Sequence, residues 1–178
     1  MKTTVKTLVP TGEMTLGPFF PREFGRGAND LTTCEGRTAK GEVIEMTGCV
    51  TQADGAPLDN AILEIWKASA AGRFDDPDFF GWGRAATDAH GIYTFRTIKP
   101  GAIPGRAPHV NFLILFSGLM RQLQTVMFFE GDNAGDPVFD AVNPPSLRER
   151  LIARTENPGR YRFDIRLRGE GETPFFDD

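Results

Sequence analysis

The chain has 178 residues, of which 40% are hydrophobic, 11% aromatic and 25% charged, and its formal net charge is −4. This length and composition fit one soluble globular domain with a hydrophobic core. No apolar run approaches the roughly 20 residues that a membrane-spanning helix needs, and the N-terminus lacks a signal-peptide pattern. We therefore expect no membrane span and a cytoplasmic location. No cluster of Lys and Arg suited to a phosphate backbone is present, so nucleic-acid binding is not predicted.

Taken in chain order, residues 1–40 are irregular and rich in Gly, Thr and Pro, and we expect an N-terminal arm that packs on the following domain or on a partner. Residues 41–178 show short runs in which apolar and polar side chains alternate, the period of a half-buried strand. The clearest run is residues 161–168, with four apolar side chains on one face and four charged ones on the other. The predicted strands are residues 43–50, 61–66, 92–98, 109–116, 122–129 and 161–168.

Turn signals separate these runs, for example Asp54-Gly55 and the segment from Asp88 to Gly91. Only residues 146–155 have a helical pattern, between a Pro-Pro pair and a Pro-Gly pair. The sequence therefore predicts an all-β fold: an antiparallel β-sandwich with one short helix and an irregular N-terminal arm.

Candidate catalytic groups are few. The chain has two histidines and two tyrosines, and it lacks both the Gly-x-Ser-x-Gly nucleophile motif and a phosphate-binding glycine loop. His109 and Asn111 lie two residues apart in a predicted strand, so their side chains should point to one face. A single strand histidine is more often structural than a ligand, and this pattern alone leaves both readings of His109 open.

Several ordered blocks carry a family resemblance. Residues 64–74, EIWKASAAGRF, resemble the EIWQA-x-AAGRY segment of the intradiol ring-cleavage dioxygenase family. Further blocks match in order at residues 83–84, 87–88, 91–101, 106–112, 129–132, 136–137, 151–153 and 161–165. The resemblance covers most of residues 15–178. Within the family, the chain is most similar to the protocatechuate 3,4-dioxygenase type.

The resemblance implies a ferric site made of two tyrosines and two histidines, but this chain has lost most of those donors. Phe74 and Ile103 stand where the tyrosines should be, and the histidine pair reads His109-Val110-Asn111. A carboxamide is a much weaker iron ligand than imidazole, so one of four ligands survives. We expect no metal in this chain and treat Phe74, Ile103, His109 and Asn111 as vestigial metal-site positions.

A frame that lacks the metal ligands resembles the non-iron alpha subunit of these enzymes, and the C-terminal GEGETPFFD resembles the alpha-type GEGETVFFD. The resemblance implies an iron-bearing beta partner of the same fold, which holds Fe(III) and opens 3,4-dihydroxybenzoate with O₂ to 3-carboxy-cis,cis-muconate. This chain would be inactive alone. Thr15, Gly17 and Pro18 lie in a segment similar to the T-x-GPY arm, which implies that they line the substrate pocket of the partner.

The resemblance also bears on two arginines. Arg106 matches an arginine that stabilises charge in iron-bearing subunits, and here we expect a structural or interface ion pair. Alpha subunits often carry an arginine for the substrate carboxylate at the position of Ser117, and Arg121 is the candidate to replace it. Two rival hypotheses remain. The chain could be a non-catalytic β-sandwich binding or assembly protein, or a self-sufficient enzyme that uses His109 with Asp75, Asp76 or Asp78.

Overall fold

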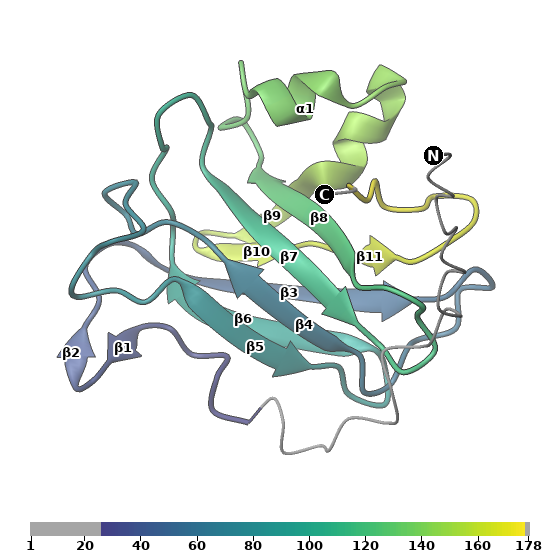
Figure 1. Cartoon of the computed structure of the whole chain (residues 1–178), viewed down its shortest axis with the longest axis horizontal. Helices are drawn as coiled ribbons and strands as arrows, with labels where there is room; N and C mark the ends of the chain where they lie inside the picture. The colour runs from purple at the N-terminus through teal and green to yellow at the C-terminus, as the bar shows by residue number, and fades with distance from the viewer. Residues whose placement is uncertain (1–25, 177–178) are drawn as a thin grey trace, which may run out of the picture.

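A computed structural model describes residues 26–176 and confirms the all-β sandwich (Figure 1). The two helices are short: the α-helix α1 (Pro137–Ala141) and the 3₁₀ helix η2 (Pro145–Leu151). No helix in the described range is both long enough and apolar enough to cross a bilayer. The strands are β1 (Thr33–Cys34), β2 (Arg37–Thr38), β3 (Val43–Thr51), β4 (Ile62–Trp66), β5 (Trp82–Ala86), β6 (Ile92–Ile98), β7 (His109–Leu115), β8 (Leu123–Phe129), β9 (Ile152–Asn157), β10 (Arg160–Arg162) and β11 (Ile165–Arg166).

The strands form two layers that are joined through β9. One layer has the antiparallel order β5–β4–β7–β8, and the other consists of β6, β3, β10 and β11. Strand β9 pairs with β8 in parallel and with β10 in antiparallel orientation. Most pairs are antiparallel, but β10 and β11 both run parallel to β3. The sandwich is therefore one continuous folded sheet of mixed orientation.

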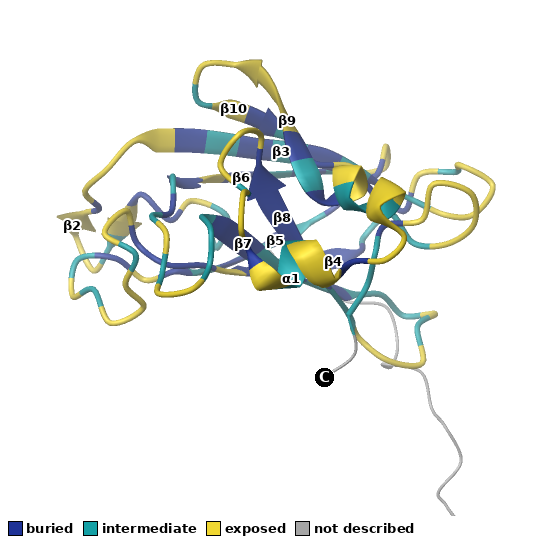
Figure 2. Ribbon diagram, turned by 90° about the horizontal axis from the view of Figure 1, so that it is seen from above, coloured by how far each residue is buried: buried dark blue, intermediate teal, exposed yellow. Residues whose placement is uncertain are grey.

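The core lies between the layers. Buried residues alternate with less buried ones along β3 (Figure 2). On β7, Val110, Phe112 and Ile114 are at most 2% exposed, while the intervening side chains face outward. Burying such side chains removes apolar surface from water at about 25 cal/mol per Å². The predicted period-two pattern of this strand is confirmed, and it determines which of its residues reach the outer face of the sheet.

Three local predictions differ from the structure. The helix over residues 146–155 is wrong beyond Leu151, because Ile152 and Ala153 pair with β8 and so override local helix propensity. The single strand over residues 161–168 is interrupted at Asp164, whose carboxylate accepts a hydrogen bond from the Cys49 amide at 2.9 Å. Strand β5 was not predicted, because its Gly and Ala residues have weak strand propensity.

Residues 26–40 lie against the exposed edges of the two layers. The Arg84 amide of β5 donates to the carbonyl oxygen of Ala28 at 2.9 Å, and the Leu31 amide donates to that of Arg96 in β6 at 2.8 Å. Leu31 is buried and packs against Gly83. This segment therefore follows β5 and β6 before the chain enters the sandwich at β3.

Candidate functional site

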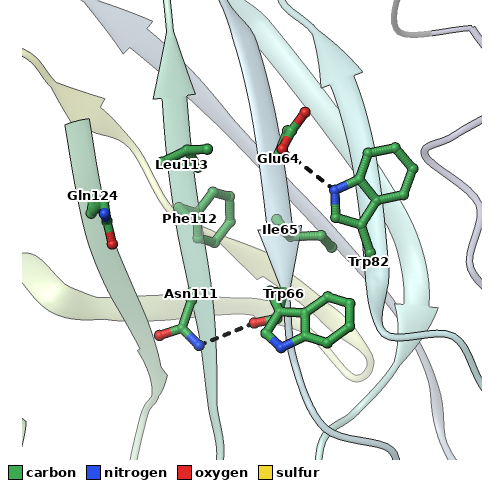
Figure 3. A pocket seen from close by; sticks show the side chains of 8 residues that line it. All are labelled: Glu64, Ile65, Trp66, Trp82, Asn111, Phe112, Leu113 and Gln124. Carbon is green, nitrogen blue, oxygen red and sulfur yellow. Dashed lines mark hydrogen bonds between the residues drawn. The ribbon is translucent and has the colours of Figure 1, made fainter. Parts of the chain in front are cut away.

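The outer face of the β5–β4–β7–β8 layer holds a cavity of about 310 Å³ (Figure 3). Side chains from all four strands stand around it because each strand exposes alternate residues on this face. Asn111 comes from β7 and Gln124 from β8, so the cavity has amide groups on one side and indole rings on the other. Its lining residues are Glu64, Ile65, Trp66, Trp82, Asn111, Phe112, Leu113 and Gln124.

Four aromatic side chains beside the cavity form what we call the aromatic surface: Trp66, Phe74, Phe80 and Trp82. The Trp66 and Phe74 rings stack with centroids 5.9 Å apart and planes 6° apart. Phe80 meets Trp66 edge-on at 5.9 Å and lies 6.3 Å from Trp82. Trp66, Phe74 and Phe80 remain 40%, 44% and 55% exposed. An apolar group gathered in this way is typical of an interaction or ligand-binding surface.

The charged groups on this face neutralise each other. Glu64 and Arg84 are directly opposite on β4 and β5, and the Arg84 Nε donates to a Glu64 carboxylate oxygen at 2.8 Å. The Trp82 Nε1 donates to the other oxygen at 3.4 Å, and the guanidinium lies 5.1 Å from the Trp82 ring. Both charged side chains are about one-fifth exposed. The pair therefore fixes the Trp82 indole and adds no net charge to the cavity.

His109 and Asn111 both lie on the outer face of β7, as their spacing predicts, but in different surroundings. The His109 ring is 6.2 Å from that of Phe128, and its Nδ1 is 2.7 Å from the Ala107 carbonyl oxygen. A carbonyl only accepts, so Nδ1 carries the proton. Burial lowers the pKa of His109, which keeps the ring neutral. The Asn111 Nδ2 instead donates to the Trp66 carbonyl oxygen at 3.2 Å (Figure 3).

Ile103 and Arg106 lie in the connection before β7 and bridge through their backbones. The Arg106 Nε donates to Asp136 at 2.7 Å, and Asp136 is completely buried. This carboxylate also accepts from the Ala107 amide and caps α1. Burial alone would raise the pKa of Asp136, but these hydrogen bonds outweigh it and leave the pKa below its usual value. The Arg106–Asp136 ion pair thus fixes the Ile103 connection to α1.

The four positions that the sequence analysis treats as vestigial metal-site positions are partly gathered in the structure. Phe74 and Asn111 both contact Trp66, and Gly72 lies directly against Ala102, so the loop of Phe74 touches that of Ile103. Arg121 does not join them: it lies in the β7–β8 connection, at the end of β7 opposite His109. Thr15, Gly17 and Pro18 lie outside the described residues.

Lys67 lies next to the site, behind the sheet, and the sequence analysis did not single it out. It follows Trp66 at the end of β4, and its side chain points to the core at 1% exposure. Burial lowers the pKa of Lys67 to about 7. The signal was available, since alternation along β4 places residue 67 on the same face as Leu63 and Ile65.

The comparisons with known proteins agree with the resemblance found in the sequence. A family model described as Dioxygenase matches residues 15–169. The protocatechuate 3,4-dioxygenase alpha chain of Burkholderia cepacia is 35% identical over 96% of this chain and 98% of its own length. The chain belongs to the intradiol ring-cleavage dioxygenase family. The beta chain from the same organism is 41% identical, over 75% of this chain and 68% of its own length.

A solved structure of the same family shows the shared fold. The dioxygenase domain of a dioxygenase carbohydrate-binding protein fusion from Streptomyces sp. SirexAA-E is 28% identical, with a TM-score of 0.62 over 90% of this chain and 99% of that one. The alpha chain from Pseudomonas putida is 40% identical over 78% of each chain. An oxidoreductase role in an intradiol dioxygenase follows from this membership.

The residues present do not fit the Fe(III) that the intradiol family uses. At the four positions that the resemblance assigns to iron ligands, the chain has the imidazole of His109, the benzyl ring of Phe74, the branched alkyl group of Ile103 and the amide of Asn111. The Asn111 amide donates to the Trp66 carbonyl oxygen. Phenolate oxygen and imidazole nitrogen are the donors such a site needs. Within residues 26–176, no three His, Cys, Asp or Glu side chains gather where they could hold a metal ion. Asp75, Asp76 and Asp78 lie in the β4–β5 loop and do not complete a site with His109.

Proposed function

We propose that this chain is the alpha, non-iron subunit of a heteromeric protocatechuate 3,4-dioxygenase. The observation that carries the proposal is the set of side chains at the four positions that the resemblance assigns to iron ligands: the sandwich frame is kept and His109 is present, while Phe74, Ile103 and Asn111 stand at the other three. The alpha-chain relative matched over 98% of its length supports the same assignment. A chain that keeps the frame and loses the ligands needs a partner to supply the iron.

In this proposal, an iron-bearing beta subunit of the same fold holds Fe(III), and no metal is expected in the present chain. The complex cleaves 3,4-dihydroxybenzoate between its hydroxylated carbons with O₂, and both oxygen atoms enter 3-carboxy-cis,cis-muconate. Thr15, Gly17 and Pro18 would line the substrate pocket of the partner. Arg106 has a structural role through Asp136. Arg121, in an exposed bend between β7 and β8, is assigned an interface or structural role.

The test is expression of the chain alone and together with an iron-bearing beta-type homologue. Alone, the purified chain should carry no stoichiometric iron and no phenolate-to-iron absorption. Together, the two chains should purify as a coloured complex that cleaves 3,4-dihydroxybenzoate. A beta chain expressed without this one serves as the matched control. An isolated chain that binds ferric ion tightly and opens dihydroxybenzoates by itself would overturn the proposal.

The exposed aromatic surface favours a second candidate function, a non-catalytic β-sandwich binding or assembly protein derived from an intradiol dioxygenase. Trp66, Phe74 and Phe80 are at least 40% exposed on one face, which is an unusual concentration of aromatic side chains for a surface. If co-expression gives neither a complex nor any gain in activity of the beta chain, this second function takes the place of the first.

A further inference from the structure

Lys67 joins the β4–β5 loop to the end of β6 through its amino group. The Nζ donates to the carbonyl oxygen of Ile98 at 2.6 Å and to that of Ala68 at 3.3 Å. It also lies 4.2 Å from the centre of the Phe79 ring. The amino group therefore contacts its own loop at Ala68 and Phe79 and the neighbouring layer at Ile98.

The loop attached in this way carries half of the aromatic surface. Residues 67–81 include Phe74 and Phe80, and the backbone amide of Lys67 closes the loop by donating to the Gly81 carbonyl oxygen at 3.1 Å. Ile98 ends β6 directly before the connection that leads to Ile103. The contacts of one side chain thus hold the two loops that carry the lost tyrosine positions.

No carboxylate compensates the charge of Lys67 among the described residues. The charged groups on the elements that pack around Lys67 have other partners. Within the loop, Arg73 pairs with Asp75, Asp76 accepts from the Asp78 amide, and Asp78 pairs with Lys40. After β6, Lys99 pairs with Asp132. A buried ammonium without a counter-ion is disfavoured, and it becomes favourable only when water reaches it.

We propose that Lys67 is a proton-sensitive latch, which holds the β4–β5 loop closed when its amine is neutral and releases the loop when the amine is protonated. The closed loop keeps Lys67 away from water, and an open loop would return it to solvent. A proton therefore binds more tightly to the open state, and acidification shifts the population toward it. Opening would move Phe74 and Phe80 and so rearrange the aromatic surface. The inference does not depend on the proposed subunit role.

The expected size of the effect follows from proton linkage. With a pKa of about 7 in the closed loop and an ordinary value of 10.5 in the open loop, the open-to-closed ratio should rise about fifty-fold between pH 9 and pH 7. Below pH 7 both states are protonated, and the ratio should level off. The latch would therefore respond most strongly just above neutral pH.

The experiment is amide hydrogen exchange of the full chain between pH 6 and pH 9, with Lys67→Met as the variant and Arg154→Met as the control at an exposed basic side chain of β9, outside the loop. At each pH, the loop exchange rate of the wild type is divided by that of Lys67→Met, which cancels the intrinsic pH dependence of exchange. This ratio should rise about fifty-fold from pH 9 to pH 7. The loop exchange rate of the wild type divided by that of Arg154→Met should not change with pH. Loop amides should also exchange faster than amides of β3 and β6.

Two results would overturn the latch. One is a ratio that does not change with pH, and the other is loop exchange no faster than that of the β3 and β6 amides, because the loop would then open only with the whole fold. If Lys67→Met does not fold, the wild-type chain labelled with ¹³C-lysine still decides the question. A Lys67 resonance that titrates near 10.5 contradicts the proposal, and one that titrates near 7 supports it.

Discussion

The side-chain amide of Asn111 donates a hydrogen bond to the backbone carbonyl of Trp66, and the two atoms are 3.2 Å apart. This bond joins β7 to β4 on the outer face of the sheet. The Trp66 ring in turn stacks on Phe74. Two positions that the family resemblance assigns to iron ligands are thus connected here by packing and hydrogen bonding to the same tryptophan.

Restoring the donors tests whether the frame still suits a metal. We expect the triple variant Phe74→Tyr, Ile103→Tyr, Asn111→His to bind about one ferric ion per chain and to gain phenolate-to-iron absorption, because the two phenolates would add hard oxygen donors to the imidazoles. Phe74 is 44% exposed, so its new hydroxyl should cost little stability. Metal analysis and visible absorption are the measurements. The same variant with His109→Ala is the control, and equal iron in both would contradict a site built around His109.

Asp136→Asn should destabilise the chain by about 2–4 kcal/mol at pH 7, because it removes the charge that Arg106 needs and weakens the cap of α1. The lowered pKa of Asp136 means that its contribution is present above its usual value of 3.8 and is lost as the pH falls further. The difference from wild type should therefore shrink toward pH 3. Denaturant unfolding measures it, with Asp140→Asn, at a half-exposed carboxylate, as the control.

Lys67 gives the opposite pH dependence. Its pKa falls from 10.5 to about 7 on folding, so between these values the unfolded chain binds more protons and stability rises with pH. From pH 7 to pH 9.5, the wild type should gain about 3 kcal/mol of unfolding free energy relative to Lys67→Met. Denaturant unfolding at the two pH values measures the difference. Parallel curves for the two proteins would show that Lys67 is hydrated in the folded state.

Thr87→Val should cost about 2–3 kcal/mol although it preserves shape, because the buried hydroxyl serves two backbone groups. It donates to the Leu58 carbonyl oxygen at 2.6 Å and accepts from the Ala61 amide at 2.8 Å. Thermal or urea unfolding measures the loss. Thr155→Val, at an exposed position of β9, should stay within about 0.5 kcal/mol of wild type. If Thr87→Val left the free energy of unfolding unchanged, water or another group would have to satisfy the Leu58 carbonyl and the Ala61 amide.

Local patterns predicted most of the strands but not their continuity. Alternation of apolar and polar residues identified β3, β4, β6, β7 and β8, since half-buried strands impose a period of two on the sequence. It failed at residues 152–157, where a helical pattern gives way to a strand because pairing with β8 and β10 outweighs local propensity. The pattern also could not predict the interruption at Asp164, because the Cys49 amide that donates to the Asp164 carboxylate lies 115 residues away in sequence.

The sequence alone determined which donors the chain possesses, and hence that Phe74, Ile103 and Asn111 cannot supply the phenolates and imidazole of a ferric site. This is a property of side-chain chemistry and needs no coordinates. Only the tertiary structure decided what those positions do instead. The stacking of Phe74 on Trp66, the bond from Asn111 to Trp66 and the bond from Lys67 to Ile98 all depend on strands and loops meeting in space. Such contacts join distant segments, and no local pattern encodes them.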